Sequence, residues 1–218
     1  MQYYAIIVAS GSGNRMGQSL PKQFSLLNKF PMLYYSLKAF HKSKFKPHII
    51  LVLNPGHVQL WEELIEKYKI KIPHQIVSGG KERFHSVKNG LNSISSTDAL
   101  VAIHDGARPL IKTETIDKIY EDASNLTNAI PVIPAAESVR YDQKTIDRSL
   151  LTIVQTPQTF SAEILKVAYR QEYDPLFTDD ASVVESAGFK IYFTEGQRSN
   201  IKITFKEDLV IAENLLKI

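Results

Sequence analysis

Short apolar runs alternate with longer amphipathic segments along most of the chain, and this alternation limits the fold more than any other feature of the sequence. The apolar runs have the length of buried strands, whereas the segments between them repeat their apolar residues every three or four positions, as helices do. Such an alternation predicts a mostly parallel sheet with helices on both faces. We expect strands at 4–9, 49–53, 74–77, 99–104 and 129–133, and helices at 31–42, 58–69, 85–93 and 113–126.

The alternation breaks after Pro134. Residues 137–141 and 145–151 flank Asp142-Gln143-Lys144, which predicts a β-hairpin. A two-stranded hairpin buries little by itself, so we expect it to lean on a partner, most simply on a second copy of the chain. The α/β pattern then resumes, with helices expected from Ser161, at 178–188 and at 206–217, and strands at 190–194 and 200–204.

The size and composition of the chain fit one α/β domain. It has 218 residues, 44% of them hydrophobic, which is enough to bury a full core. Cysteine is absent, which excludes disulfides, thiolate zinc sites and a cysteine nucleophile, and fits a reducing compartment. The apolar runs fall far short of the roughly 20 residues of a membrane span, and no charged leader precedes an apolar signal segment. We therefore expect a soluble, cytoplasmic protein without a membrane partner.

Positive charge is concentrated at the start of the chain. The first 50 residues contain seven Lys and Arg side chains and no Asp or Glu. Two of these bases, Arg15 and Lys22, lie in the glycine-containing run 11–22, which follows the first expected strand. A glycine turn after a strand presents backbone N–H groups to an anion, so this run predicts a polyphosphate ligand. Nucleic acid is not expected, because neither a basic stripe nor a recognisable nucleic-acid module is visible.

The glycine run does not match the two best-known phosphate motifs. A dinucleotide fingerprint needs a third glycine where Met16 stands, and a Walker loop needs a lysine where Gln18 stands. A flexible glycine turn carrying Arg15, followed by Pro21-Lys22-Gln23, is instead the pattern of nucleotidyltransferases that activate sugars and alditols. Fixed cations in such enzymes stabilise charge at the α-phosphate during transfer. The alternative is a tight turn whose two cations face solvent.

Asp105 follows the strand expected at 99–104 and is the first acidic candidate for the site. Ligands of open α/β sheets bind at the carboxyl edge, and a carboxylate there can hold Mg²⁺ directly or through water. The alternative role is that of a cap or turn residue. We expect Arg108 to pair with Asp105 or another carboxylate and so to hold the loop, and His104 to be oriented by the strand end instead of taking part in catalysis.

A double glycine follows the strand expected at 74–77. Gly79 and Gly80 would let the backbone approach a flat base closely, and Ser86 can read an edge of that base through a hydrogen bond. Taken alone, the segment would pass as an ordinary loop.

Together these segments closely resemble the 2-C-methyl-D-erythritol 4-phosphate cytidylyltransferase family of the non-mevalonate isoprenoid pathway. The resemblance covers nearly the whole chain. It implies a single nucleotidyltransferase domain over 1–218 with a three-layer α/β/α, Rossmann-like fold, and a protruding β-arm at about 137–152 that embraces the neighbouring subunit of a homodimer. The motifs that carry it are the opening run through Pro21-Lys22-Gln23, residues 79–83 with Ser86, and residues 104–109, 156–158, 178–182 and 200–204.

The resemblance also implies a reaction and a set of residue roles. The phosphate of methylerythritol phosphate attacks the α-phosphorus of CTP, giving 4-diphosphocytidyl-2-C-methyl-D-erythritol and diphosphate without a covalent enzyme intermediate. Arg15 and Lys22 would stabilise the transition state, and Asp105 would serve the Mg²⁺–CTP complex. Lys202 and Arg148 would position the alditol phosphate, with Arg148 acting in trans. CTP would be bound by Ala9, Ser10, Gly11, Gly13, Gly80, Lys81 and Ser86, and the alditol by Ser138 and Thr156.

Three positions depart from what the family leads us to expect. Ser10 stands where Ala or Gly is common, Lys81 where a carboxylate near the base is common, and Ser138 where we expect threonine. Ser138 keeps the hydroxyl, whereas the other two positions affect the expected basis of cytosine preference.

Two other functions stay open at this point. The nearest rival is ribitol-5-phosphate cytidylyltransferase of teichoic acid synthesis, which resembles the family in fold and chemistry; the segments 82–86 and 104–108 favour the methylerythritol enzymes. A non-catalytic nucleotide-binding protein would bind CTP without turnover. The joint presence of the charged residues argues against it: Arg15, Lys22, Asp105, Arg148 and Lys202.

Overall fold

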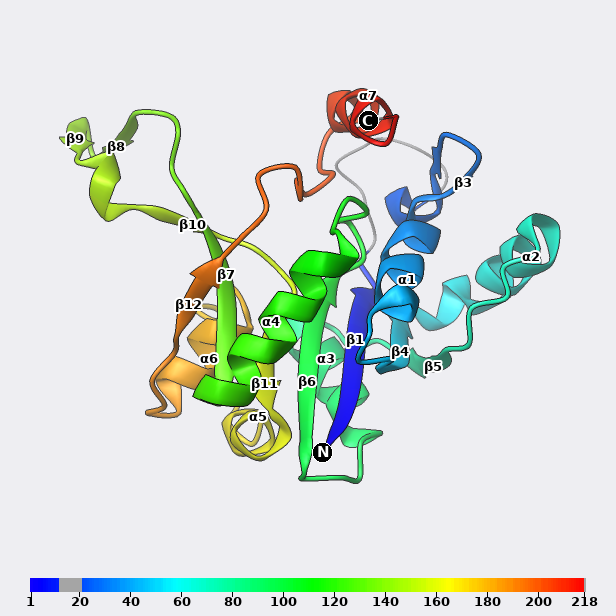
Figure 1. Cartoon of the computed structure of the whole chain (residues 1–218), viewed down its shortest axis with the longest axis horizontal. Helices are drawn as coiled ribbons and strands as arrows, with labels where there is room; N and C mark the ends of the chain where they lie inside the picture. Colours follow the sequence, from blue (N-terminus) through cyan, green and yellow to red (C-terminus); the bar gives the residue numbers. More distant parts are fainter. Residues whose placement is uncertain (12–20, 218) are drawn as a thin grey trace.

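A mixed sheet forms the centre of the molecule (Figure 1). The computed structural model describes residues 1–11 and 21–217. Within these ranges the sheet has eight strands in the order β10-β7-β11-β6-β1-β4-β5, with β12 also paired to β7. The strands are β1 Gln2–Ala9, β4 His48–Leu53, β5 Gln75–Ser78, β6 Ala99–Asp105, β7 Asn128–Pro134, β10 Thr152–Val154, β11 Gln158–Ser161 and β12 Phe193–Glu195.

Helices cover both faces of the sheet, which confirms the predicted three layers. One core cluster packs α1, α2 and α4 against one face, and a second packs α3, α5 and α6 against the other. Strand β1 serves both, because Ala5 and Ile7 point into the first cluster while Ile6 points into the second. The helices are α1 Met32–Lys42, α2 Val58–Tyr68, α3 Arg83–Asn92, α4 Thr113–Leu126, α5 Ala162–Ala168, α6 Asp180–Ser186 and α7 Lys206–Leu215.

The parallel part of the sheet agrees with the predicted strands. β1 runs parallel to both β4 and β6, and β4 runs parallel to β5. The sequence did not predict β11, a strand that lies antiparallel between β6 and β7. Its four residues include Gln158 and Thr159, both polar and both buried. Such a short polar stretch has no strand-like pattern, and the two neighbouring strands supply its hydrogen-bond partners.

The strand predicted at 200–204 is not a strand in the structure, and this prediction was wrong. The segment is held instead by single contacts, such as the bond from the Ile203 N–H to the Ala107 carbonyl at 2.8 Å. Ile203 is fully buried, which explains the apolar signal without a sheet ladder. The neighbouring strand prediction, 190–194, corresponds to β12.

The predicted hairpin is present as β8 Val139–Tyr141 and β9 Lys144–Ile146. Asp142 and Gln143 at its tip both have positive φ, 45° and 62°, as a tight two-residue hairpin turn requires. The hairpin projects far from the sheet at one end of the molecule (Figure 1). Exposed apolar side chains accompany it, with Tyr141 75% and Leu150 79% exposed. We call residues 137–152 the arm.

Among the described residues, none of the helices has the length and apolar character needed to cross a bilayer.

Candidate active site

A cavity of about 590 Å³ opens at the carboxyl ends of the parallel strands. β1 ends at Ala9, β4 leads into Asn54, β5 leads toward Gly80, and β6 ends at Asp105, and all four residues line it. This is the edge at which open α/β sheets bind ligands. Of the predicted site residues, the cavity brings together Ala9, Ser10, Gly11, Lys22, Gly80, Lys81, Asp105 and Lys202.

Tight backbone packing forms the wall predicted to face the cytidine. A Cβ on Gly79 would lie 2.4 Å from the Ser10 Cβ, and one on Gly80 would lie 2.4 Å from the His85 Cβ, so a side chain fits at neither position without rearrangement. Ser86 is fully buried behind this wall. Its hydroxyl bonds the Ser10 hydroxyl at 2.8 Å and accepts from the Gly80 N–H at 3.0 Å. Ser86 thus holds two loops of the wall together.

The Pro-Lys-Gln motif forms a short turn, η2 Lys22–Phe24, beside the cavity. Gln23, to which the sequence assigned no role, is buried and donates to the carbonyls of Ala9 at 2.8 Å and Gly11 at 3.1 Å. These bonds attach the turn to the end of β1. Lys22 reaches the opposite side, where its ammonium donates to the Ile203 carbonyl at 2.9 Å. The Lys22 ammonium therefore contacts the backbone of the residue that follows Lys202 in the sequence.

Hydrogen bonds fix the end of β6. The Asp105 N–H donates to the Thr156 hydroxyl at 3.0 Å, and that hydroxyl lies 3.2 Å from the His104 Nδ1. His104 Nε2 lies 3.1 Å from the Arg108 carbonyl. Burial lowers the pKa of His104 to about 4, so the ring is neutral at pH 7. His104 is thus oriented within the strand end, as predicted, and buried Thr156 supports the backbone of Asp105.

Arg108 does hold a loop, but not through the predicted carboxylate. Its guanidinium donates to the Asn200 carbonyl at 2.8 Å, which connects the end of β6 to the segment that carries Lys202. Within the described ranges, the ion pairs of Asp105 are made by other cations.

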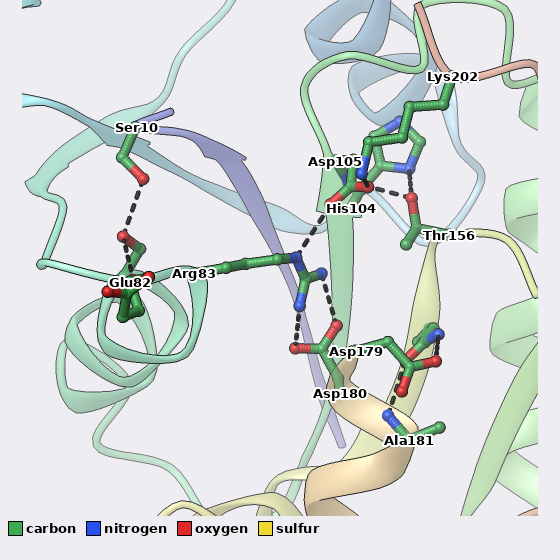
Figure 2. Close-up of polar contacts among 12 residues, drawn as sticks. Ser10, Glu82, Arg83, His104, Asp105, Thr156, Asp179, Asp180, Ala181 and Lys202 are labelled. Carbon is green, nitrogen blue, oxygen red and sulfur yellow. Dashed lines mark hydrogen bonds and ion pairs between the residues drawn. The ribbon is translucent and has the colours of Figure 1, made fainter. Parts of the chain in front are cut away.

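Two cations share the carboxylate of Asp105 (Figure 2). Oδ1 accepts from Arg83 Nε at 3.1 Å, and Oδ2 lies 2.8 Å from Lys202 Nζ. Burial alone would raise the pKa of this carboxyl, but Arg83 and Lys202 outweigh burial and hold the pKa of Asp105 well below its usual range. Asp105 is therefore a permanent anion at neutral pH.

Arg83 and Asp180 belong to the sequence motifs at 79–83 and 178–182, but the sequence indicated no role for either residue. The Arg83 guanidinium forms a second, bidentate pair with Asp180 at 2.9 and 2.7 Å. Asp180 is the first residue of α6 and fully buried. The sequence signal for a role of Arg83 was its position after the double-glycine loop at the carboxyl edge of the sheet. Its partner Asp180 lies on a distant helix and could not be recognised from the sequence.

The site fits a divalent cation only if the substrate supplies further ligands. Among the described residues, no group of three or more His, Cys, Asp or Glu side chains is arranged to hold a metal ion. Asp105 provides one carboxylate on the cavity wall. Mg²⁺ is commonly bound through one or two carboxylates together with substrate phosphates. Asp105, on a wall that also includes Glu82, agrees with that mode of binding.

The arm residues are not part of this cavity. Ser138 and Arg148 are both exposed, and Arg148 donates to the carbonyl of Ala136, just before the arm, at 3.0 Å. The single chain therefore does not bring them together with Asp105 and Lys202. Arg15 and Gly13, also predicted for the site, lie outside the described residues.

Comparison with known proteins places this geometry in a family. A profile of the family described as IspD, 2-C-methyl-D-erythritol 4-phosphate cytidylyltransferase, matches residues 3–218. A protein of that name from Bacteroides fragilis is 47% identical over 216 residues, covering 97% of this chain and 98% of its own length. The enzyme of that name from Bacillus cereus is 39% identical, covering 99% and 98%.

Solved structures agree. The 4-diphosphocytidyl-2C-methyl-D-erythritol synthase of Anaerococcus prevotii superimposes with a TM-score of 0.84 at 26% identity, covering 100% of this chain and 96% of that chain. The 2-C-methyl-D-erythritol 4-phosphate cytidylyltransferase of Thermus thermophilus gives a TM-score of 0.79 at 26% identity, with both chains covered fully. The chain belongs to the 2-C-methyl-D-erythritol 4-phosphate cytidylyltransferase family.

Proposed function

We propose that the cavity at the carboxyl edge is where this enzyme transfers a cytidylyl group, and that Lys22, Asp105 and Lys202 are central to it. The activity of the enzyme is the conversion of CTP and 2-C-methyl-D-erythritol 4-phosphate to 4-diphosphocytidyl-2-C-methyl-D-erythritol. The observation that carries the assignment is the pairing of Asp105 with Lys202, beside Lys22, at the end of the parallel strands.

The two substrates would occupy different walls of the cavity. Ala9, Ser10, Gly80 and Lys81, backed by Ser86, would face the cytosine and ribose. The triphosphate would extend along Gly11, with Gly13 and Arg15 of the glycine run and Lys22 around it. The cavity lining supports this placement, because it includes both Lys22 and Gly11.

In the transfer, a phosphate oxygen of the alditol phosphate forms a new bond to the α-phosphorus of CTP. The bond from that phosphorus to the bridging oxygen breaks, and diphosphate leaves with the electron pair. Lys22 and Arg15 would stabilise the charge that develops on the α-phosphate oxygens, while Lys202 orients the attacking phosphate. Positioning and charge stabilisation suffice for this chemistry, so no side chain needs to form a covalent bond to substrate.

Asp105 would hold Mg²⁺ together with the phosphates of CTP, directly or through water. The cation, when bound, would neutralise negative charge on the triphosphate. Thr156 would act here through its bond to the Asp105 N–H, in addition to its predicted place near the alditol.

The arm would complete the site of a second subunit. Its exposed apolar side chains, Tyr141 and Leu150, need a covering surface, and the same hairpin carries Arg148 and Ser138. We propose a homodimer in which Arg148 binds the alditol phosphate in the partner's cavity, with Ser138 on the alditol side. Residues 1–218 would then act as one nucleotidyltransferase domain with an arm at about 137–152.

The protein would work in the cytoplasm, because CTP is a multiply charged molecule that does not cross a membrane unaided. Cell fractionation followed by immunodetection checks this, and recovery outside the cytoplasmic fraction would contradict it.

A coupled diphosphate-release assay with CTP and each alditol phosphate tests the assignment. The wild-type enzyme should turn over methylerythritol phosphate faster than ribitol 5-phosphate. Asp105→Asn and Lys202→Ala should each lose most of this activity, while Lys42→Ala, which removes an exposed lysine on α1, should keep it. Full activity of Asp105→Asn and Lys202→Ala would remove the assignment of the cavity.

A further inference from the structure

A chain of charged side chains continues from the cavity into the protein interior (Figure 2). It starts at Lys202, passes through Asp105 and Arg83, and ends at Asp180. The two ends differ most in exposure: the side chain of Lys202 is 44% exposed and that of Asp180 is 0% exposed, with Asp105 at 11% and Arg83 at 28% between them. One end of the chain is accessible to ligands, and the other is not.

The buried end is fixed by several independent contacts. Asp180 binds two nitrogen atoms of Arg83 and also accepts the Tyr169 hydroxyl at 2.6 Å. Tyr169 is itself buried, and its ring stacks on Phe84 with centroids 4.8 Å apart. A bidentate pair between a planar guanidinium and a carboxylate fixes direction as well as distance. Arg83 therefore has little freedom to rotate away from Asp105.

The accessible end is held more weakly. Lys202 reaches Asp105 through one flexible side chain and one ion pair, at 2.8 Å. An ammonium is a point charge with rotatable donors, so it can exchange one anionic partner for another. A substrate phosphate in the cavity is such a partner.

We infer that Arg83, Asp180 and Tyr169 are positioning residues for the transfer reaction. They keep Asp105 paired and correctly aimed while Lys202 moves from Asp105 to the phosphate of a substrate. This inference rests on the roles proposed above for Asp105 and Lys202.

The physical reason is the cost of an unpaired charge. Asp105 is largely buried, and a carboxylate in that position loses stability when it is left without a cationic side chain. With Arg83 held in place by Asp180, Asp105 keeps one counter-ion throughout. Without Arg83, Lys202 would be retained by Asp105 and would be less available to phosphate. The same role fits Asp180 of the Thr178-Asp179-Asp180 motif, which does not line the cavity but binds Arg83.

The competing explanation is purely structural, with Arg83 serving only to join α3 to α6. The two explanations differ in what they predict for activity per folded molecule. A structural clip affects stability alone, whereas a positioning role also affects kcat and the KM of the substrate that Lys202 binds.

Tyr169→Phe is the mildest test, because it removes only the hydroxyl that orients Asp180. We expect kcat to fall about tenfold and the KM of methylerythritol phosphate to rise more than that of CTP, since displaced catalytic groups lose rate steeply. Tyr120→Phe is the matched control, because it removes a buried tyrosine hydroxyl bonded at 2.7 Å to the Tyr4 carbonyl, away from the cavity. That variant should lose stability but keep its kcat.

Arg83→Lys gives the larger perturbation, because an ammonium cannot reproduce the three nitrogen contacts of Arg83. We expect a fall in kcat of about a hundredfold. If this variant does not fold, Tyr169→Phe decides the question.

A double-mutant cycle with Lys202→Ala separates positioning from general damage. If Tyr169 acts through Asp105 and Lys202, the Tyr169→Phe substitution should change kcat by less than about twofold in the Lys202→Ala background. An equal loss in both backgrounds would overturn the inference, as would a wild-type kcat in Tyr169→Phe. If Asp105→Asn alone keeps full activity, the site assignment itself falls; if Asp105→Asn is inactive while Tyr169→Phe is normal, only the positioning role falls.

Discussion

The cavity edge and the arm are built in opposite ways. At the edge, the end of β6 is connected to α3, and through α3 to α6, by ion pairs, and to Thr156 by a buried hydrogen bond. The arm holds itself together through local contacts, such as the bonds of Ser149 and Arg148 to acceptors within twelve residues along the chain. The contacts of the edge join residues far apart in one chain, whereas the arm presents polar and apolar groups outward.

The two regions derive their order from different contacts. The edge is ordered by tertiary contacts, so loss of one buried group should disturb several others. The arm is an isolated hairpin, which is marginal by itself, so its final placement depends on what covers it. The predictions below test this contrast in order of expected effect.

Asp180→Ala should have the largest effect on stability. It removes the buried carboxylate that binds two nitrogen atoms of Arg83 and the Tyr169 hydroxyl, and each buried polar group left without a partner typically costs about 1–3 kcal/mol. Asp147→Ala on the arm is the matched control, because Asp147 is an exposed carboxylate bonded only to Ser149. Urea unfolding should show a lower midpoint for Asp180→Ala and a wild-type midpoint for Asp147→Ala. Equal losses would mean that the two regions are equally coupled to the fold.

Among the variants that keep the fold, Lys22→Ala should have the largest effect on catalysis. Loss of a fixed group that stabilises transition-state charge lowers kcat by about 10²–10³-fold. The affinity for CTP should change much less, because the cation is needed most as charge develops. Steady-state kinetics together with titration calorimetry of CTP measure both quantities, with Lys42→Ala as control. A change confined to CTP affinity would show that Lys22 only binds the ground state.

Mixing two inactive variants tests whether the arm acts in trans. Lys22→Ala and Arg148→Ala subunits should recover about a quarter of the wild-type activity, because half of the dimers would be mixed and each would have one intact site. Either variant mixed with itself is the control. Without recovery, under conditions where labelled subunits demonstrably exchange, Arg148 would have to serve its own subunit.

Leu150→Ser should change assembly and leave the fold nearly unaffected. Leu150 is exposed on the arm, and substitutions at exposed positions usually alter stability by less than about 0.5 kcal/mol. If the arm packs on a second copy, a hydroxyl there should weaken the dimer, which sedimentation velocity measures. Leu126→Ser, on an exposed position of α4, is the control and should keep the dimer. A Leu150→Ser dimer of wild-type strength would place the contact elsewhere.

Much of the fold could be predicted because its signal is local. β1, β4 and β6 are continuous apolar runs, and α1, α2 and α4 carry a regular apolar stripe. The missed strand β11 and the strand wrongly predicted at 200–204 have a common cause. β11 is a strand because β6 and β7 flank it. Residues 200–204 do not form a strand, because the Ile203 N–H bonds the carbonyl of Ala107, which lies in a loop. Pairing partners of this kind cannot be recognised from a short segment alone.

The site shows the same division. The Lys22 and Asp105 predictions rested on their position after glycine turns or strands, and the structure brings both to one cavity. The network around Arg83 was not predicted, because Asp180 is 97 residues away in sequence and Tyr169 looks like an ordinary core residue. Gln23 was overlooked because an amide that bonds backbone carbonyls leaves no pattern in the sequence.

The sequence by itself determined the alternating architecture, the hairpin and the residue types of a nucleotidyl-transfer site, because periodicity and turn chemistry act over a few residues. Only the tertiary structure decided which of those charges meet. An ion pair depends on distances of about 3 Å between atoms on different elements, and the sheet order and the packing of α3 against α6 set those distances. The Lys202–Asp105–Arg83–Asp180 chain is therefore a property of the fold that no single segment contains.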